Sequence, residues 1–179
     1  MPAFGAANAR LLIVGLAPGL HGANRTGRPF TGDYAGDLLY ETLLRHNLAR
    51  GEYRKAADDG LELVDCAIGN AVRCVPPKNK PLPAEINTCR QFLAAHIASL
   101  PRLRAILALG KVAHDSAVRA LGGKLAAHPF GHGARTRIGE ISLVSSYHCS
   151  RYNTNTGVLT AEMFDAVVKE ARLAATPQL

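Results

Sequence analysis

The stretch LLIVGLAPGLHGANRTGRPFTGD, residues 11–33, decides the fold of this chain and points to its functional site. Its first four residues are apolar and predict a buried strand. The residues that follow are rich in glycine, proline and polar side chains, which cannot continue a strand. In an open α/β sheet, ligands bind beyond the carboxyl ends of the strands. We therefore expect a binding loop here, with backbone N–H groups, the Phe30 ring and the Asp33 carboxylate around one small ligand.

The rest of the chain alternates between strand and helix patterns. We expect strands at 11–16, 63–67, 104–109 and 141–146, and helices at 36–46, 83–100, 111–121 and 160–174. This alternation indicates right-handed crossovers and a mostly parallel sheet covered on both faces. The fold class is therefore α/β, and a length of 179 residues suits a single domain over 1–179.

Composition limits the class of protein and of partner. A formal net charge of +7 and a pI near 9.5 favour a polyanionic partner such as nucleic acid, with an ordinary basic surface as the alternative. No apolar run is long enough to span a bilayer and no signal-peptide pattern is found, so we expect a cytoplasmic protein.

The chain has four cysteines, Cys66, Cys74, Cys89 and Cys149. A cytosolic setting argues against disulfides. The absence of a C-x-x-C pair argues against a zinc ribbon. Four is nevertheless the number of thiolates that an iron–sulfur cluster needs.

Unusual polar loops follow three of the predicted strands, at 15–33, 70–80 and 147–157. The carboxyl ends of parallel strands lie at one edge of a sheet, so these loops can converge although they are far apart in the sequence. This convergence is the basis of the functional prediction.

Several side chains in these loops have both a structural and a functional interpretation. Asp33 could cap the next helix, or orient water and stabilise a developing cation. Phe30 could plug the core, but we favour a platform for a planar base because only 6% of residues are aromatic. His148 has polar neighbours and could stabilise an oxyanion on a leaving group.

The second loop, VPPKNKP, is basic and proline-rich. Lys78, Asn79 and Lys80 could clamp a phosphate, with Asn79 reaching the ligand, or could form a solvated basic loop. Asn70, at the preceding strand end, could read a base edge through its amide.

Three segments together resemble the uracil-DNA glycosylase superfamily, above all its family 5 (UDGb-type) enzymes. Residues 15–33 are similar to the first motif of that family, NAVRCVPPKNKPLPAEINTC (70–89) to its second block, and SYHCSRYNTNTG (146–157) to its final His motif. HPFGHGA (128–134) also has a counterpart, and the similarity runs from about residue 10 to the end of the chain.

The resemblance implies a three-layer α/β/α sandwich with a central, mostly parallel four-stranded sheet. It also implies an enzyme that flips a damaged base out of DNA and hydrolyses the N-glycosidic bond. Asp33 would then be the catalytic carboxylate, Asn79 an assisting residue and His148 the donor to uracil O2, while Phe30 would stack on the base. The pocket would be lined by Asn70 and by Gly15, Leu16, Ala17, Pro18 and Gly19.

DNA carrying uracil or another deaminated base is the implied partner, bound by a protein that we expect to be a monomer. The 149–157 loop would help to fill the gap left by the flipped nucleotide. The residues implied to contact DNA are Arg25, Lys78, Lys80, Ser150, Arg151 and Asn153.

The chain departs from the family pattern at two places. Related family 4 and 5 enzymes carry a [4Fe-4S] cluster on four cysteines, of which two match Cys74 and Cys89 and two form an N-terminal C-x-x-C that is absent here. We therefore expect no intact cluster on this chain. Either the start of the given sequence is truncated, or the protein does without the cluster. Asn70 replaces a residue that is often small in family 5, and family 4 has an Asn that recognises uracil. We expect it to narrow selectivity towards uracil.

Two other classes of function are consistent with parts of the pattern. A DNA-binding protein of the same fold could bind single-stranded or abasic DNA without catalysis. A small-molecule nucleotide hydrolase would also use a glycine-rich loop, but the chain lacks G-x-x-x-x-G-K-[ST].

Overall fold

The computed structural model describes residues 1–176, apart from the side chain of Asn79. Six strands form the main sheet in the order β1-β5-β2-β6-β8-β7. Its four inner strands are parallel, and both edge strands are antiparallel to their neighbours. The strands are β1 (Phe4–Gly5), β2 (Leu11–Gly15), β5 (Cys66–Asn70), β6 (Ala105–Leu109), β7 (Arg135–Ile138) and β8 (Ile141–Ser146). The predicted α/β fold with a mostly parallel sheet is confirmed, whereas β1 and β7 were not predicted.

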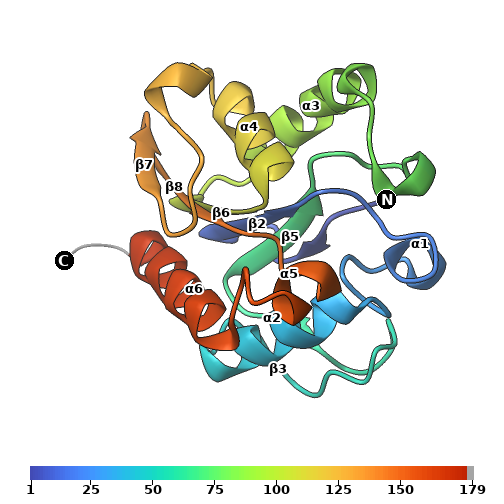
Figure 1. The fold of residues 1–179 in the computed structure, drawn as a ribbon. Helices are drawn as coiled ribbons and strands as arrows, with labels where there is room; N and C mark the ends of the chain where they lie inside the picture. Colours follow the sequence, from blue (N-terminus) through green and yellow to red (C-terminus); the bar gives the residue numbers. More distant parts are fainter. Residues whose placement is uncertain (177–179) are drawn as a thin grey trace.

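Helices cover both faces of this sheet, which makes three layers (Figure 1). α3 (Pro83–Ala98) and α4 (Lys111–Ala120) lie on one face, and α2 (Tyr34–Arg45) and α6 (Ala161–Ala175) lie on the other. The shorter helices are α1 (Ala23–Thr26), η1 (Pro77–Asn79), η2 (Leu125–Ala127) and α5 (Arg151–Asn155). Within residues 1–176, no helix combines the length and the apolar character needed to cross a membrane.

The predicted strand at 63–67 is the element whose position differs most from the structure. Its first part belongs to a separate small ribbon, in which β4 (Glu62–Leu63) pairs with β3 (Ala49–Arg50). The chain then turns at Asp65, whose φ is 54°, before β5 begins at Cys66. The apolar pattern continues across this turn, so periodicity alone could not detect it.

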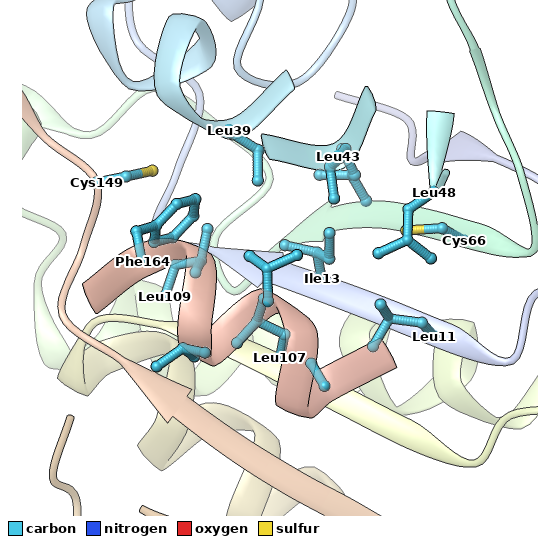
Figure 2. Packing of buried hydrophobic residues seen from close by; sticks show 14 of the residues in the cluster. Leu11, Ile13, Leu39, Leu43, Leu48, Cys66, Leu107, Leu109, Cys149 and Phe164 are labelled. Atoms are coloured by element: carbon cyan, nitrogen blue, oxygen red, sulfur yellow. The ribbon is translucent and has the colours of Figure 1, made fainter. Parts of the chain in front are cut away.

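Strand β2 supplies both halves of the core because alternate side chains point to opposite faces of a sheet. Leu11 and Ile13 pack in the cluster that includes Phe164 of α6, while Leu12 and Val14 pack in the cluster on the α3–α4 side. Figure 2 shows the first cluster, with Leu11 and Ile13 directed towards the covering helices. Truncating such a buried leucine to alanine costs roughly 2–5 kcal/mol of stability.

The register of the parallel strands brings the site segments to one end of the sheet. Gly15, the last residue of β2, pairs with Asn70, the last residue of β5. On the other side, Leu109 of β6 pairs with Ser146 of β8, two residues before His148. The loops that follow these strands, with α1 and α5, gather at this carboxyl end in Figure 1.

Candidate functional site

A cavity lies at the carboxyl end of the parallel strands. Its volume of about 510 Å³ falls within the range of small-ligand pockets. Its lining comes from the loop after β2, the start of α2, the end of β5 and the loop after β8. The lining residues are Leu16, Ala17, Gly19, Ala23, Phe30, Asp33, Tyr34, Ala35, Asn70, His148, Ser150 and Arg151.

The structure therefore brings together segments from the first and third predicted loops, and one residue from the second. Asn70 is the contribution of the 70–80 segment to this lining, and the basic stretch of that segment lies elsewhere. Lys78 and Lys80 are exposed on and after η1, and Arg25 is exposed on α1. The side chain of Asn79 lies outside the described part of the chain.

Asp33 occupies the N-cap position of α2 but makes no capping hydrogen bond with its side chain. Its carboxylate lies against the backbone of Gly22, where the Cβ of any larger residue would overlap the carboxyl group. Only glycine permits this approach. The carboxylate accepts a long hydrogen bond of 3.4 Å from the N–H of Ala23. Most of its hydrogen-bonding capacity therefore remains open to a ligand.

Gly15 lies against the side chains of Phe30 and Asn70, which both line the pocket. A Cβ at Gly15 would lie 2.5 Å from both the Phe30 Cζ and the Asn70 Oδ1, so no larger residue fits there without displacing a neighbour. The Asn70 Oδ1 is buried and has no hydrogen-bond partner among the described residues. An unpaired buried amide oxygen is costly, which makes this side chain a candidate for contact with a ligand.

Phe30 has a backbone conformation that is uncommon for a large residue. Its φ is 56°, in the left-handed region. Phe30 is 7% exposed and belongs to a hydrophobic cluster, and it also lines the pocket, so it is part of the core and is accessible to a ligand on one side. It stacks on the imidazole of His148, with 6.0 Å between the ring centroids and 25° between the planes. The two rings come from segments more than a hundred residues apart.

Burial lowers the pKa of His148 to about 4, because the charged form loses hydration without gaining a partner. The imidazole is therefore neutral at pH 7. A neutral imidazole carries one N–H donor and can donate a hydrogen bond without carrying a full charge. The backbone around it is fixed by Asn153, whose Nδ2 donates to the carbonyl of His148 at 2.8 Å.

The rim of the pocket carries aromatic and basic groups. The guanidinium of Arg151 lies over the ring of Tyr34, 5.1 Å from its centroid. The neighbouring Tyr152 is 74% exposed. Ser150 lines the pocket and is also the N-cap of α5, where its Oγ accepts the N–H of Asn153 at 3.4 Å. Tyr34 also lines the pocket, although it was not predicted as a site residue.

The thiols of this chain do not fit a four-iron cluster by themselves. Cys66 and Cys149 are buried, and burial raises the pKa of the Cys149 thiol to about 12 and that of Cys66 further, so both thiols stay protonated. Cys74 is exposed and Cys89 half-buried, which leaves two accessible candidates for a cluster that needs four. In the described part of the chain, no group of three or more Cys, His, Asp or Glu side chains is placed to hold a metal ion.

Known proteins similar to this chain are named uracil-DNA glycosylases. The family model described as the uracil DNA glycosylase superfamily matches residues 2–172. The Type-5 uracil-DNA glycosylase of Thermus thermophilus is 46% identical over 173 residues, which are 96% of this chain and 78% of that protein. The Type-5 enzyme of Mycobacterium tuberculosis is 45% identical over 175 residues, which are 96% of this chain and 65% of that protein.

A more distant likeness covers less of the chain. The Type-4 uracil-DNA glycosylase of Thermotoga maritima is 39% identical over 105 residues, which are 58% of this chain and 46% of that protein. The Type-5 likeness therefore extends over nearly all of this chain, and the Type-4 likeness over 58% to 68% of it.

Proposed function

The chain belongs to the uracil-DNA glycosylase superfamily, and from this premise we propose that its pocket receives uracil extruded from DNA and hydrolyses the N-glycosidic bond. The observation that supports this most strongly is the juxtaposition of Asp33, Phe30 and His148 in one cavity of about 510 Å³. The product is free uracil together with an abasic site in the DNA.

Extrusion of the base is the first requirement of this reaction. A base inside a duplex cannot be reached, so the enzyme must offset unpairing and unstacking energy. Contacts from Lys and Arg to phosphates supply part of that energy and depend on salt. We propose Arg25, Lys78, Lys80 and Arg151 for these contacts. We propose that the 149–157 segment, in which Tyr152 on α5 is 74% exposed, helps to fill the gap in the stack.

Asp33 would act on the sugar. Cleavage leaves the positive charge of an oxocarbenium-like sugar, which a carboxylate stabilises. The open oxygens of Asp33 can also orient the water that adds to C1′ of the sugar. We assign Asn79 as an assisting residue on the resemblance of its motif.

His148 and the backbone at 15–19 would act on the departing base. Uracil leaves as an anion with charge on O2, and a donor placed at that oxygen lowers the barrier. In this proposal, neutral His148 donates this hydrogen bond to uracil O2, and Phe30, which also stacks on the imidazole, stacks on the uracil ring. Because the pKa of His148 is low, its contribution is a hydrogen bond and does not need a protonated imidazole.

Asn70 would read the base. Its amide offers both a donor and an acceptor, which matches the adjacent carbonyl and N–H of the uracil edge. Asn70 lines the pocket, and its buried Oδ1 has no hydrogen-bond partner among the described residues, which supports this assignment. Asn153, in contrast, donates its amide to the carbonyl of His148, which supports a role in holding that loop in addition to the predicted DNA contact.

Other parts of the proposal concern the whole molecule. We propose that residues 1–179 form one glycosylase domain that acts as a monomer in the cytoplasm. If a [4Fe-4S] cluster is present, Cys74 and Cys89 are the residues of this chain that would bind it, as two of its four thiolate ligands. Visible absorption and iron content of anaerobically purified protein test this assignment.

The activity can be tested with a uracil-containing oligonucleotide, followed by alkaline cleavage of abasic sites. Wild-type protein should give a cut strand, and Asp33→Asn and His148→Ala should each lower the single-turnover rate about 10²–10³-fold. Asp65→Asn is the matched control, because Asp65 lies at the opposite end of the sheet, paired with Arg10. It should keep the wild-type rate.

The same assay distinguishes the alternative functions. Salt-sensitive DNA binding without release of uracil would contradict the proposal and favour a DNA-binding protein without catalysis. The identity to known glycosylases does not favour that alternative.

A further inference from the structure

An ion pair behind the pocket takes no part in the reaction described above. Arg28 and Asp59 are joined by two hydrogen bonds of 2.8 Å, and their side chains are only 4% and 0% exposed. The Asp59 carboxylate also accepts the backbone N–H groups of Arg54 at 2.9 Å and Leu61 at 3.0 Å. The carboxylate is therefore anchored in the 54–61 loop, and it fixes the plane of the guanidinium.

Burial of two charges is not by itself a gain in stability, because the lost hydration can exceed their attraction. A fully hydrogen-bonded buried pair does, however, fix a conformation, since breaking it leaves an uncompensated charge. A further hydrogen bond of Arg28 shows which part of the chain this pair holds in place. The Nε of Arg28 donates to the Oγ1 of Thr31 at 2.7 Å, and Thr31 is completely buried. The guanidinium thus spans the turn that has Phe30 at its centre.

The same guanidinium also packs against two tyrosines that donate hydrogen bonds to the backbone of this turn. It lies over the rings of Tyr40 and Tyr53, at 5.3 Å and 5.8 Å from their centroids. The hydroxyl of Tyr40 donates to the carbonyl of Pro29 at 2.5 Å, and that of Tyr53 donates to the carbonyl of Phe30 at 3.3 Å. Two consecutive carbonyls of the turn are therefore held by tyrosines that pack on Arg28.

Phe30 needs such support. A residue with a Cβ rarely adopts a φ of 56°, and it persists there only when its surroundings over-determine the conformation. This conformation directs the ring against Gly15 and His148 in the pocket. A relaxed turn would move the ring out of these contacts.

We propose that Arg28 and Asp59 are positioning residues, which hold Phe30 in its left-handed conformation so that its ring meets the extruded base and the imidazole of His148. Neither residue contacts the ligand in this assignment. It rests on the proposed function, because its effect is measured as excision of uracil.

The test compares Arg28→Lys and Thr31→Val with wild-type protein in single-turnover excision, with the folded fraction of each determined from its unfolding curve. Lysine keeps the charge but loses the fork of donors, and valine keeps the shape of Thr31 but removes the acceptor of the Arg28 Nε. We expect each variant to lose about 10–100-fold in kcat/KM per folded molecule, as displacements of about 1 Å near a reacting centre do. Arg10→Lys is the control, because Arg10 pairs with Asp65 at the far end of the sheet, and its rate should equal that of wild type.

A double-mutant cycle separates positioning from a merely structural role. In a Phe30→Ala background, where no ring remains to be positioned, Arg28→Lys should cause no further loss in kcat/KM. Wild-type activity in Arg28→Lys or Thr31→Val, or losses that multiply with Phe30→Ala, would overturn the proposal. If Arg28→Lys does not fold, Thr31→Val decides, since it leaves the ion pair intact. Wild-type protein that releases no uracil would instead contradict the proposed function.

Discussion

The two ends of the parallel sheet differ in whether their polar side chains have hydrogen-bond partners within the chain. At the amino end, Arg10 and Asp65 pair with one another, so the charge of each has a partner within the chain. At the carboxyl end, Asp33 has one long hydrogen bond and the Asn70 Oδ1 has none among the described residues. This difference shows that polar groups with unused hydrogen-bonding capacity around a cavity indicate a functional site more strongly than polar residues alone do.

In tests of this difference, the largest effect is expected at Gly15, where a substitution shows whether the cavity at the carboxyl end of the sheet is the base site. Gly15→Ala would place a Cβ 2.5 Å from both Phe30 and Asn70, so we expect the pocket to close and kcat/KM for uracil excision to fall about 10²-fold. Gly131→Ala is the matched control, because its Cβ would meet its nearest neighbour at an ordinary 3.7 Å. Single-turnover excision measures both. Equal rates for the two variants would mean that this part of the cavity is not the base site.

A smaller effect is expected from the unpaired amide. Asn70→Ala should lower excision of uracil about tenfold, the equivalent of one good hydrogen bond, and should raise relative activity on other deaminated bases. Asn8→Ala, which removes an exposed amide ahead of β2, should change neither. Oligonucleotides with uracil, hypoxanthine or xanthine at the same position measure the ratio. An unchanged preference in Asn70→Ala would remove Asn70 from base recognition.

The smallest expected effect is on the pH dependence of the rate. The pKa of His148 is about 4, so its imidazole stays neutral from pH 8 down to pH 5, and kcat/KM should change less than about twofold for this reason over that range. An imidazole with the ordinary pKa of about 6.5 would already be mostly protonated at pH 5. A pH–rate profile with its acid limb near pH 6.5 would contradict the assignment.

Stability follows from the same pKa. The unfolded chain binds a proton on His148 near pH 6.5, and the folded chain only near pH 4. The contribution to stability is therefore complete above pH 6.5 and is lost as the pH falls towards 4. Urea unfolding at pH 7 and pH 5 measures this loss, which His148→Ala should reduce because it removes the titrating group.

The sequence predicted the layers of the fold better than the edges of the sheet. The strand at Ile141–Ser146 and the helix beginning at Pro83 match the predicted boundaries, because the apolar residues of ISLVSS and a proline in the first turn of the helix are strong local signals. In the edge strand β7, which reads RTRI, exposed residues alternate with half-buried ones. Only the last of its four residues is apolar, so the sequence gives little indication of a strand. Its place in the sheet depends on pairing with β8.

The site shows the same division. The motif around Asp33 and the polar turn at His148 were visible as unusual loops at strand ends. Arg28 and Asp59 were not, since a buried ion pair between residues 31 positions apart has no local pattern. Tyr34 was missed because nothing in the sequence marks which side of α2 faces the cavity.

The sequence by itself determined the alternation of strands and helices, the buried character of β2 and the family to which the chain belongs. All three depend on residue types at short spacing, which local backbone physics and motif order make readable. Only the tertiary structure decided that Phe30 stacks on His148, that burial lowers the pKa of His148, and that Gly15 lies against Phe30 and Asn70. The reason is that desolvation and close packing depend on which distant segments become neighbours, and that is settled when the sheet assembles.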